Sequence, residues 1–288
     1  MNLEESSQEF QFADSSAIVH TLVTRYAGIW AFIWGMCIAI LGGLIGLGGA
    51  EFRLPVLLSF FRIRAAPAVI INLTTSLVTV TFSLIFRGGL GYLRYAVPHL
   101  PVVLNLLCGA LVGSYVGSHI ASRMREGVLM RVIALCLVAL SFTLIAHDFI
   151  FQIEAANIPP ILLIVLGIFA GFVIGLFSSI LGVAGGELLI PTLVLLFGVE
   201  IKLAGSLSLL ISLPSMMLGL WRYSRFPQFN EAKRYVSLSV FLATGSIIGA
   251  LLGSLALQHV SGALLTILLG VILLASAVRL FTHRPAHT

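Results

Sequence analysis

The chain has 288 residues, of which 59% are hydrophobic and only 9% are charged. Soluble domains carry about 25% charged residues, so this composition excludes an ordinary soluble domain and predicts an integral membrane protein. The formal net charge of +5 comes mostly from Lys and Arg between apolar runs, which indicates membrane topology and argues against nucleic-acid binding.

The apolar runs follow a polar, acidic segment, residues 1–24, which lacks the basic start of a signal peptide and is interpreted as a largely disordered tail. A membrane-spanning helix needs roughly 20 apolar residues. The runs are continuously apolar, which favours helices over the alternating strands of a membrane barrel. The eight predicted spans are residues 28–45, 66–86, 98–122, 127–147, 160–181, 202–221, 236–257 and 261–281.

Two glycine-rich breaks interrupt this pattern, and each contains a glutamate and a proline. The first reads GLGGAEFRLPVL from Gly46, and the second reads GVAGGELLIPTL from Gly182. Each break leads into an apolar piece that is too short to span a membrane alone, at 54–61 and at 190–197.

The two breaks align at one offset, since Pro191 lies 136 positions after Pro55. The same offset aligns Glu51 with Glu187 and the glycines of CGALVGSYVGS with those of ATGSIIGALLGS. One register that joins separate patterns indicates internal duplication, which is common in transporters. The predicted organisation is a tail (1–24), a first transmembrane repeat (25–147), a linker (148–159) and a second transmembrane repeat (160–288).

The glycines of the second pattern recur at every fourth position. Small residues at this spacing let two membrane helices approach closely, so we predict a structural role in helix packing. The two triplets are Gly109, Gly113 and Gly117, and Gly245, Gly249 and Gly253.

The breaks predict a different role, because backbone released from a helix persists in a membrane only where protein buries it or where it lines a wet cavity. Proline is well tolerated in the first helical turn, so Pro55 and Pro191 are predicted to begin two half-helices, the second ending at Gly198. Helix N-termini attract anions, and two of them near mid-membrane would form an anion site. Glycine kinks that serve packing alone are the alternative.

Glu51 and Glu187 are the acidic residues predicted inside the membrane, where a carboxylate is costly and usually marks function. Either could carry a coupling proton, either could accept hydrogen bonds from loop amides, and Glu51 could pair with Arg53. Arg53 in the site would favour an anionic ligand, whereas the second half has Leu189 at that position. We expect Glu51 to be structural and Glu187 to be more exposed to substrate or proton.

Polar side chains on the neighbouring spans can line a pathway or satisfy released backbone groups. No metal-ligand set, nucleophile–base pair or phosphate loop occurs, so no enzyme activity, metal or cofactor is predicted. The predicted substrate-binding residues are Gly46, Gly48, Gly49, Ala50, Glu51, Arg53, Pro55, Asn72, Thr75, Ser179, Gly182, Gly185, Gly186, Glu187, Pro191, Ser206 and Ser208.

At the paired breaks the chain resembles the sulfite exporter TauE/SafE family, also called the toluene sulfonate uptake permease family, over roughly residues 28–281. The resemblance implies transport of small sulfur oxyanions or organosulfur anions such as sulfite, sulfoacetate or aryl sulfonates. Ala50 departs from the pattern, because the second half has Gly186 there. The positions that match the family are Gly46, Gly48, Gly49, Glu51 and Pro55, then Gly182, Gly185, Gly186, Glu187 and Pro191.

We therefore predict an all-α membrane protein, a bundle of about eight transmembrane helices in two homologous repeats, each with a re-entrant break and a half-helix. The predicted function is secondary transport of a small anion bound between the two broken helices, with proton coupling as one option. A passive anion channel and a non-transporting accessory membrane protein are the alternatives. The expected partners are the anion and the lipid bilayer of the cell (inner) membrane, and a homo-oligomer is left open.

Overall fold

The computed structural model describes residues 26–87, 96–125, 127–128, 131–132, 159–257, 260 and 264. Within these ranges every regular element is a helix, and six helices are long and apolar enough to cross a membrane. The six are Tyr26–Ile45, α3 (Ala65–Phe86), η2 with α5 (Val97–His99 and Leu100–Arg123), α7 (Pro160–Leu181), α9 (Ile201–Tyr223) and α11 (Val236–Ala256).

Six of the predicted spans thus correspond to long apolar helices, with bounds that differ from the prediction by two residues or fewer. The predicted spans 127–147 and 261–281 lie almost wholly outside the described residues, as do the tail and the linker. The count of eight spans therefore stays a prediction.

Two shorter helices follow the glycine breaks. The first is α2 (Ala50–Pro55), which continues into the π-helical turn η1 (Val56–Phe60), and the second is α8 (Gly186–Phe197). The prediction that prolines begin these helices is wrong, because Pro55 and Pro191 are each the sixth helical residue. The left-handed glycines just before the helices already turn the chain, and each proline instead removes the N–H that would bond the glutamate carbonyl four residues earlier. Gly198 ends α8 in the left-handed conformation, as predicted.

The long helices pair across the two halves of the chain. In α5, the glycine triplet lies against backbone atoms of α7, and in α11 the second triplet lies against the helix Tyr26–Ile45. Residue numbers rise together along both partners, so each pair runs parallel. In α5, Gly109, Gly113 and Gly117 lie against the backbone carbonyls of Ile168, Phe172 and Leu176, respectively. In α11, Gly245, Gly249 and Gly253 lie against the backbone carbonyls of Phe32, Met36 and Ile40, respectively. The packing role predicted for the triplets is confirmed.

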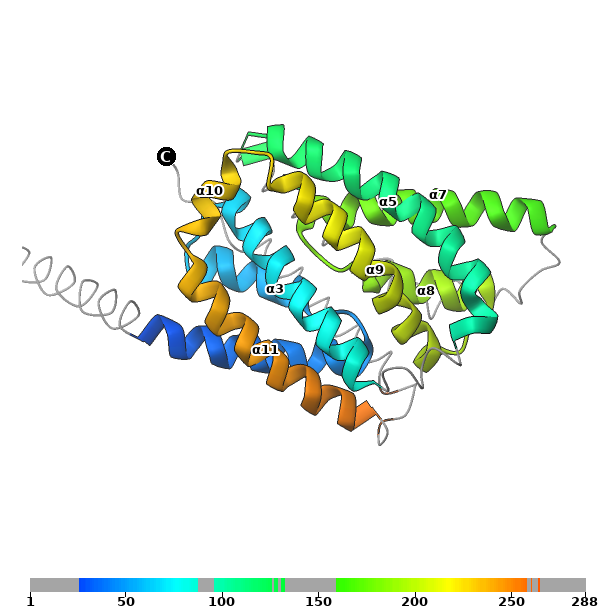
Figure 1. Ribbon diagram of the computed structural model, residues 1–288, viewed down its shortest axis with the longest axis horizontal. Helices are drawn as coiled ribbons and strands as arrows, with labels where there is room; N and C mark the ends of the chain where they lie inside the picture. The colour runs from blue at the N-terminus through cyan, green and yellow to red at the C-terminus, as the bar shows by residue number, and fades with distance from the viewer. Residues whose placement is uncertain are drawn as a thin grey trace, which may run out of the picture.

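The helices α3 and α9 lie between these two pairs and run in opposite directions (Figure 1). The start of α3 adjoins the short helix α10 (Gln228–Lys233), because Arg64 Nη1 lies 3.4 Å from Glu231 Oε2. At the other end, the Arg87 side chain that follows α3 donates to Ser206 in the first turns of α9.

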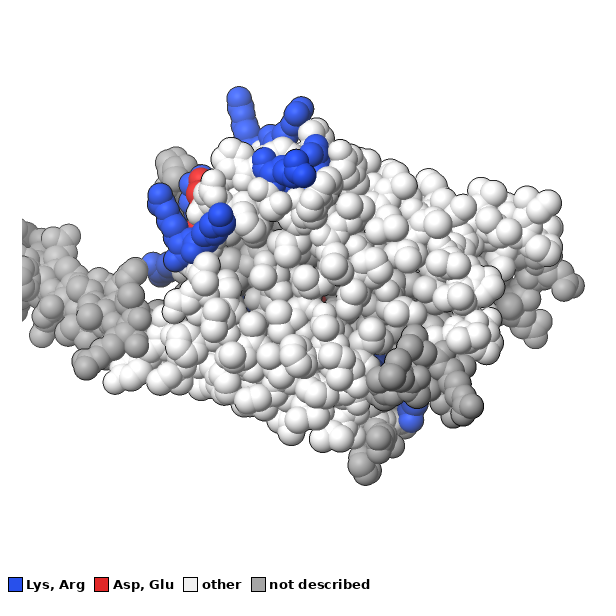
Figure 2. All heavy atoms as spheres, viewed as in Figure 1, with Lys and Arg blue, Asp and Glu red and all other residues white. Residues whose placement is uncertain are grey.

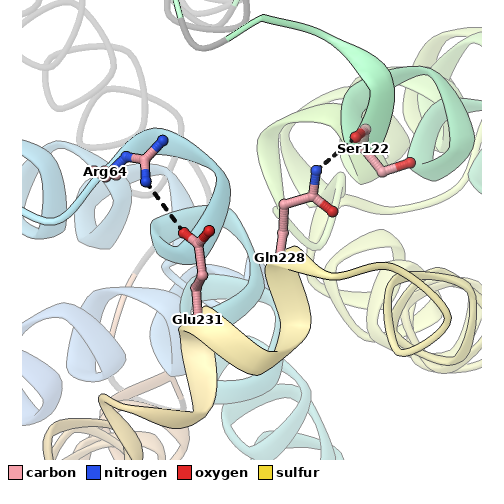
Figure 3. A network of polar contacts seen from close by, with 4 residues as sticks. All are labelled: Arg64, Ser122, Gln228 and Glu231. Carbon is pink, nitrogen blue, oxygen red and sulfur yellow. Dashed lines mark hydrogen bonds and ion pairs between the residues drawn. The ribbon is translucent and has the colours of Figure 1, made fainter.

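The end of the bundle at α10 is rich in exposed basic side chains, and we call it the basic end. Figure 2 shows Lys and Arg gathered there, whereas the surface over the middle of the bundle is almost entirely uncharged. Through Gln228, which donates to the Ser122 carbonyl at 2.8 Å, and Glu231, α10 ties together the start of α3 and the end of α5 (Figure 3). The opposite end, where α3 ends and α5 and α9 begin, is the far end. The exposed basic side chains that define the basic end are Arg64, Arg123, Arg225, Lys233 and Arg234.

Candidate functional site

The first glycine break folds the chain into a helical hairpin. A β-carbon at Gly49 would lie 2.7 Å from the Ile38 carbonyl oxygen, and the ring of Phe60 packs against Trp30 and Trp34. The segment α2–η1 therefore runs back along the helix Tyr26–Ile45 toward the basic end. The backbone φ is positive at Gly46 (97°), Gly48 (84°) and Gly49 (71°), which explains why the turn consists of glycines.

The second break forms a hairpin from α7 and α8. A β-carbon at Gly185 would lie 3.1 Å from Ile174 Cγ2, and one at Gly167 would lie 2.9 Å from Phe197 Cζ. The helix α8 therefore runs back along α7 toward the far end, opposite to the direction of the first hairpin. Gly182 and Gly185 have φ of 66° and 75°, so this turn also depends on glycine.

The turns of the two hairpins meet between α3 and α9. We call residues 46–49 the first tip and residues 182–186 the second tip. A β-carbon at Gly186 would lie 2.9 Å from Leu47 Cα, and one at Gly48 would lie 3.1 Å from Ala184 Cβ. Each tip approaches from its own end of the bundle, and the close approach leaves no room for larger residues at Gly48 and Gly186.

The contacts of the tips recur at the offset of 136 residues found in the sequence. Gly46 lies against the carbonyl of Gly205 in α9, and Gly182 lies against the carbonyl of Val69 in α3. Val69 and Gly205 are 136 positions apart, as are Gly46 and Gly182. Ile38, which faces Gly49, and Ile174, which faces Gly185, are also 136 positions apart.

Side chains of α3 and α9 bond the carbonyls that the breaks release. Asn72 Nδ2 donates to the Ala50 carbonyl at 2.9 Å, and Ser208 Oγ donates to the Gly46 carbonyl at 2.9 Å. Ser212 Oγ bonds the Ala184 carbonyl in the second tip. These bonds fix the shape of the tips, which a released backbone inside a membrane requires.

Glu51 and Glu187 lie beside the tips and are fully buried, at 0% and 1% exposure. Both carboxylate oxygens of Glu51 and the Oε1 of Glu187 lack a hydrogen-bond partner in the described part of the chain. Solvent exposure does not distinguish the two glutamates, so the expectation that Glu187 is the more exposed to substrate or proton stays a prediction. The two carboxyl groups remain candidates for holding a proton, because an unpaired ionised carboxylate is costly to bury.

Arg53 is also fully buried, and it does not pair with Glu51. Its guanidinium donates to Ser76 Oγ at 2.9 Å, to Thr79 Oγ1 at 3.2 Å and to Ser246 Oγ at 3.3 Å. A direct ion pair with Glu51, one of the alternatives that the sequence left open, is not formed, since the side chain extends to α3 and α11. Among the described residues, Arg53 Nε has no hydrogen-bond partner, so we count it as a donor that a ligand could use.

Other predicted site residues have different partners. Thr75 bonds the carbonyl of Ile71 in its own helix, and Ser179 Oγ lies 2.6 Å from Ser114 Oγ in α5. Ser206 accepts a hydrogen bond from Arg87 at 2.9 Å. The hydroxyl groups of Thr75 and Ser179 therefore bond other groups and not the carbonyls of the tips, although both residues are buried.

Several residues of this region lie outside the predicted set of site residues. Ser76 and Thr79 belong to the polar residues of the predicted span 66–86 but were not included in the predicted site. They follow Asn72 at helical spacing on α3, which is the pattern that could have included them. The roles of Ser246 and Arg87 could not be predicted from their neighbouring residues, because each contacts residues that are far away in sequence. Among the described residues, no group of three or more His, Cys, Asp or Glu could hold a metal ion.

The chain is similar to a known protein family over most of its length. The family model for the sulfite exporter TauE/SafE matches residues 31–280. No curated protein and no solved structure gives a match. The match covers five of the six long helices completely, the helix Tyr26–Ile45 from residue 31 onward, and both glycine breaks, so the chain belongs to the sulfite exporter TauE/SafE family of membrane transporters.

Proposed function

We propose that this chain is a secondary transporter of a small sulfur oxyanion or organosulfur anion, with its binding site where the two hairpin tips meet. The observation that carries the proposal is the burial of Glu51, Glu187 and Arg53 beside two broken helices that enter from opposite ends. Broken helices at a repeat interface are where secondary transporters bind substrate. The recurrence of the tip contacts at one offset supports two inverted repeats, each with a re-entrant hairpin.

Arg53 and a protonated glutamate provide complementary groups for an oxyanion. The guanidinium supplies positive charge and a free N–H, and a protonated carboxyl supplies an O–H donor. Within the part of the chain that the structure describes, both glutamates lack a hydrogen-bond partner for at least one oxygen, which makes the neutral form the less costly one at these buried positions. A proton and an anion would therefore bind together, and the proton gradient would drive the anion.

The distribution of charge supports one orientation in the membrane. Exposed Lys and Arg gather at the basic end, and cytoplasmic loops carry an excess of such residues. We propose that the basic end faces the cytoplasm of a cell whose inner membrane holds the protein. The first tip is then approached from the cytoplasmic side along its hairpin, and the second tip from the outside.

The test is flux into liposomes that contain the purified full-length protein. Sulfite, sulfoacetate and toluenesulfonate are offered with and without an inwardly directed pH gradient, to wild type and to Glu51→Gln and Glu187→Gln. Glutamine keeps size and hydrogen bonding but cannot ionise, so loss of pH-driven uptake with retained anion exchange supports the proton role. The exposed Glu200→Gln serves as the matched control.

Three results would separate the alternatives. Uphill accumulation supports a coupled transporter, whereas flux that only follows the anion gradient indicates a channel. Absence of flux for all three anions in well-folded protein would favour an accessory membrane protein. Wild-type coupling in both glutamine variants would remove these carboxylates from the proton pathway.

A further inference from the structure

Arg87 and Tyr223 make the same contact at equivalent places in the two halves. Arg87 Nη2 donates to the carbonyls of Gly43 and Leu44, both at 2.8 Å, near the end of the helix that precedes the first tip. Tyr223 Oη donates to the carbonyl of Ser179 at 2.8 Å, near the end of α7, which precedes the second tip. The two donors are 136 positions apart, and so are their acceptors Gly43 and Ser179.

The chemistry of these contacts follows from the helix ends. The last carbonyls of a helix have no N–H partner within the helix, so an outside donor stabilises the end where it is. Arg87 lies just after the last residue of α3, and Tyr223 is the last residue of α9. The Arg87 contact therefore joins the helix Tyr26–Ile45 to the end of α3, and the Tyr223 contact joins α7 to the end of α9.

The two contacts lie at opposite ends of the bundle. Because α3 ends at the far end, Arg87 closes the first hairpin from that side, where it also bonds Ser206 of α9. Because α9 ends at the basic end, Tyr223 closes the second hairpin from the basic end. The Tyr223 side chain is buried there, at 3% exposure. Both contacts are formed at once in this structure.

We propose that Arg87 and Tyr223 are positioning residues that act as two latches, each controlling access to the tips from its own end of the molecule. Release of the Arg87 latch opens the site to the far end, and release of the Tyr223 latch opens it to the basic end. The inference rests on the proposed transport function, because only a transporter needs access from both ends in turn.

The difference between the two side chains makes the latches unequal. Arg87 makes charge-assisted bonds through Nε and Nη2, whereas Tyr223 makes one neutral bond, and charge-assisted bonds are about twice as strong. An anion arriving from the far end can also compete with the carbonyls for the Arg87 guanidinium. The far-end latch therefore responds to the substrate itself, and the basic-end latch does not.

The test measures access without any substrate, so its result does not depend on successful transport. A reporter, Ser212→Cys, is placed beside the second tip in protein whose Cys37, Cys108 and Cys136 are replaced by alanine. Membrane-impermeant thiol reagents, one anionic and one cationic, are added from either side of oriented liposomes. Labelling of a separate Asn230→Cys variant, exposed at α10, identifies the basic end.

Tyr223→Phe removes only the hydroxyl donor and should raise reporter labelling from the basic end by about fivefold, the effect of one neutral hydrogen bond. Arg87→Met should raise labelling from the far end by a larger factor with both reagents, and Arg87→Lys should restore part of the closure. The matched controls are Tyr235→Phe and Lys202→Met, which leave both acceptors bonded. Acceleration from the same side by both variants, or unchanged labelling in folded Tyr223→Phe and Arg87→Met protein, would overturn the proposal.

Discussion

Replacement of Gly113 by alanine tests whether the glycine triplets set the distance between helices of the two halves. A β-carbon at Gly113 would lie 2.8 Å from the backbone nitrogen of Leu176 and closer still to the carbonyl oxygen of Phe172. An ordinary β-carbon contact begins at 3.4 Å, so α5 and α7 would have to separate. Both obstacles are backbone atoms, so no change of rotamer can relieve the overlap.

The expected loss of stability is roughly 1–3 kcal/mol, the range for overpacking a well-packed contact, and leucine should cost more than alanine. The assay is thermal unfolding of the purified protein in detergent, where a loss of this size lowers the midpoint by roughly 2–4 °C per kcal/mol. Gly249→Ala should behave similarly, because Gly249 faces the Met36 carbonyl in the equivalent contact. The matched control is Gly127→Ala, since no atom of the described residues lies within 4 Å of a β-carbon there.

Equal midpoints for Gly113→Ala and Gly127→Ala would refute the packing argument. A well-folded Gly113→Ala protein with altered preference among anions would instead indicate that the triplet lines the substrate pathway. Anion preference is therefore measured on whatever variant protein remains folded.

Two further predictions concern Arg53 and orientation. Arg53→Leu copies Leu189 of the second half and removes the buried positive charge, so affinity for sulfite in a titration should fall by about tenfold or more, because hydrogen bonds to charged groups are worth roughly 1.5–3 kcal/mol. Unchanged affinity in folded Arg53→Leu protein would exclude the guanidinium from the site. Asn230→Cys should be labelled in cells only by reagents that reach the cytoplasm, because it lies at the basic end. Strong labelling from outside would reverse the orientation.

The long helices could be predicted because their signal is local. Length and continuous apolarity locate a span, so α7 was predicted at the bounds that the structure has. The starts of the short helices were predicted wrongly, because the prolines were weighed above the left-handed glycines. The meeting of the two breaks was an expectation from the repeat, and the contact of Gly186 with Leu47 agrees with it.

The partners of the buried charges could be predicted only in part. Residues two apart on a helix do not face each other, so the pairing of Glu51 with Arg53 required an irregular loop that the structure does not have. Arg53 instead reaches Ser246, 193 residues away in sequence. This contact forms because α11 packs beside helices of the first half of the chain, and the sequence around Arg53 or Ser246 does not show which helices pack together.

The pairing of helices from different halves has a consequence for biosynthesis. Met36 and Gly249, which lie in contact, are 213 positions apart, so the helix Tyr26–Ile45 is synthesised long before the helix that packs against it. Neither half can complete its own packing, because α5 needs α7 and α11 needs the helix Tyr26–Ile45. In a fragment that ends before α11, the face of the helix Tyr26–Ile45 that normally contacts α11 would contact lipid instead. Such a fragment would be incompletely packed and is expected to be a substrate for membrane-protein quality control.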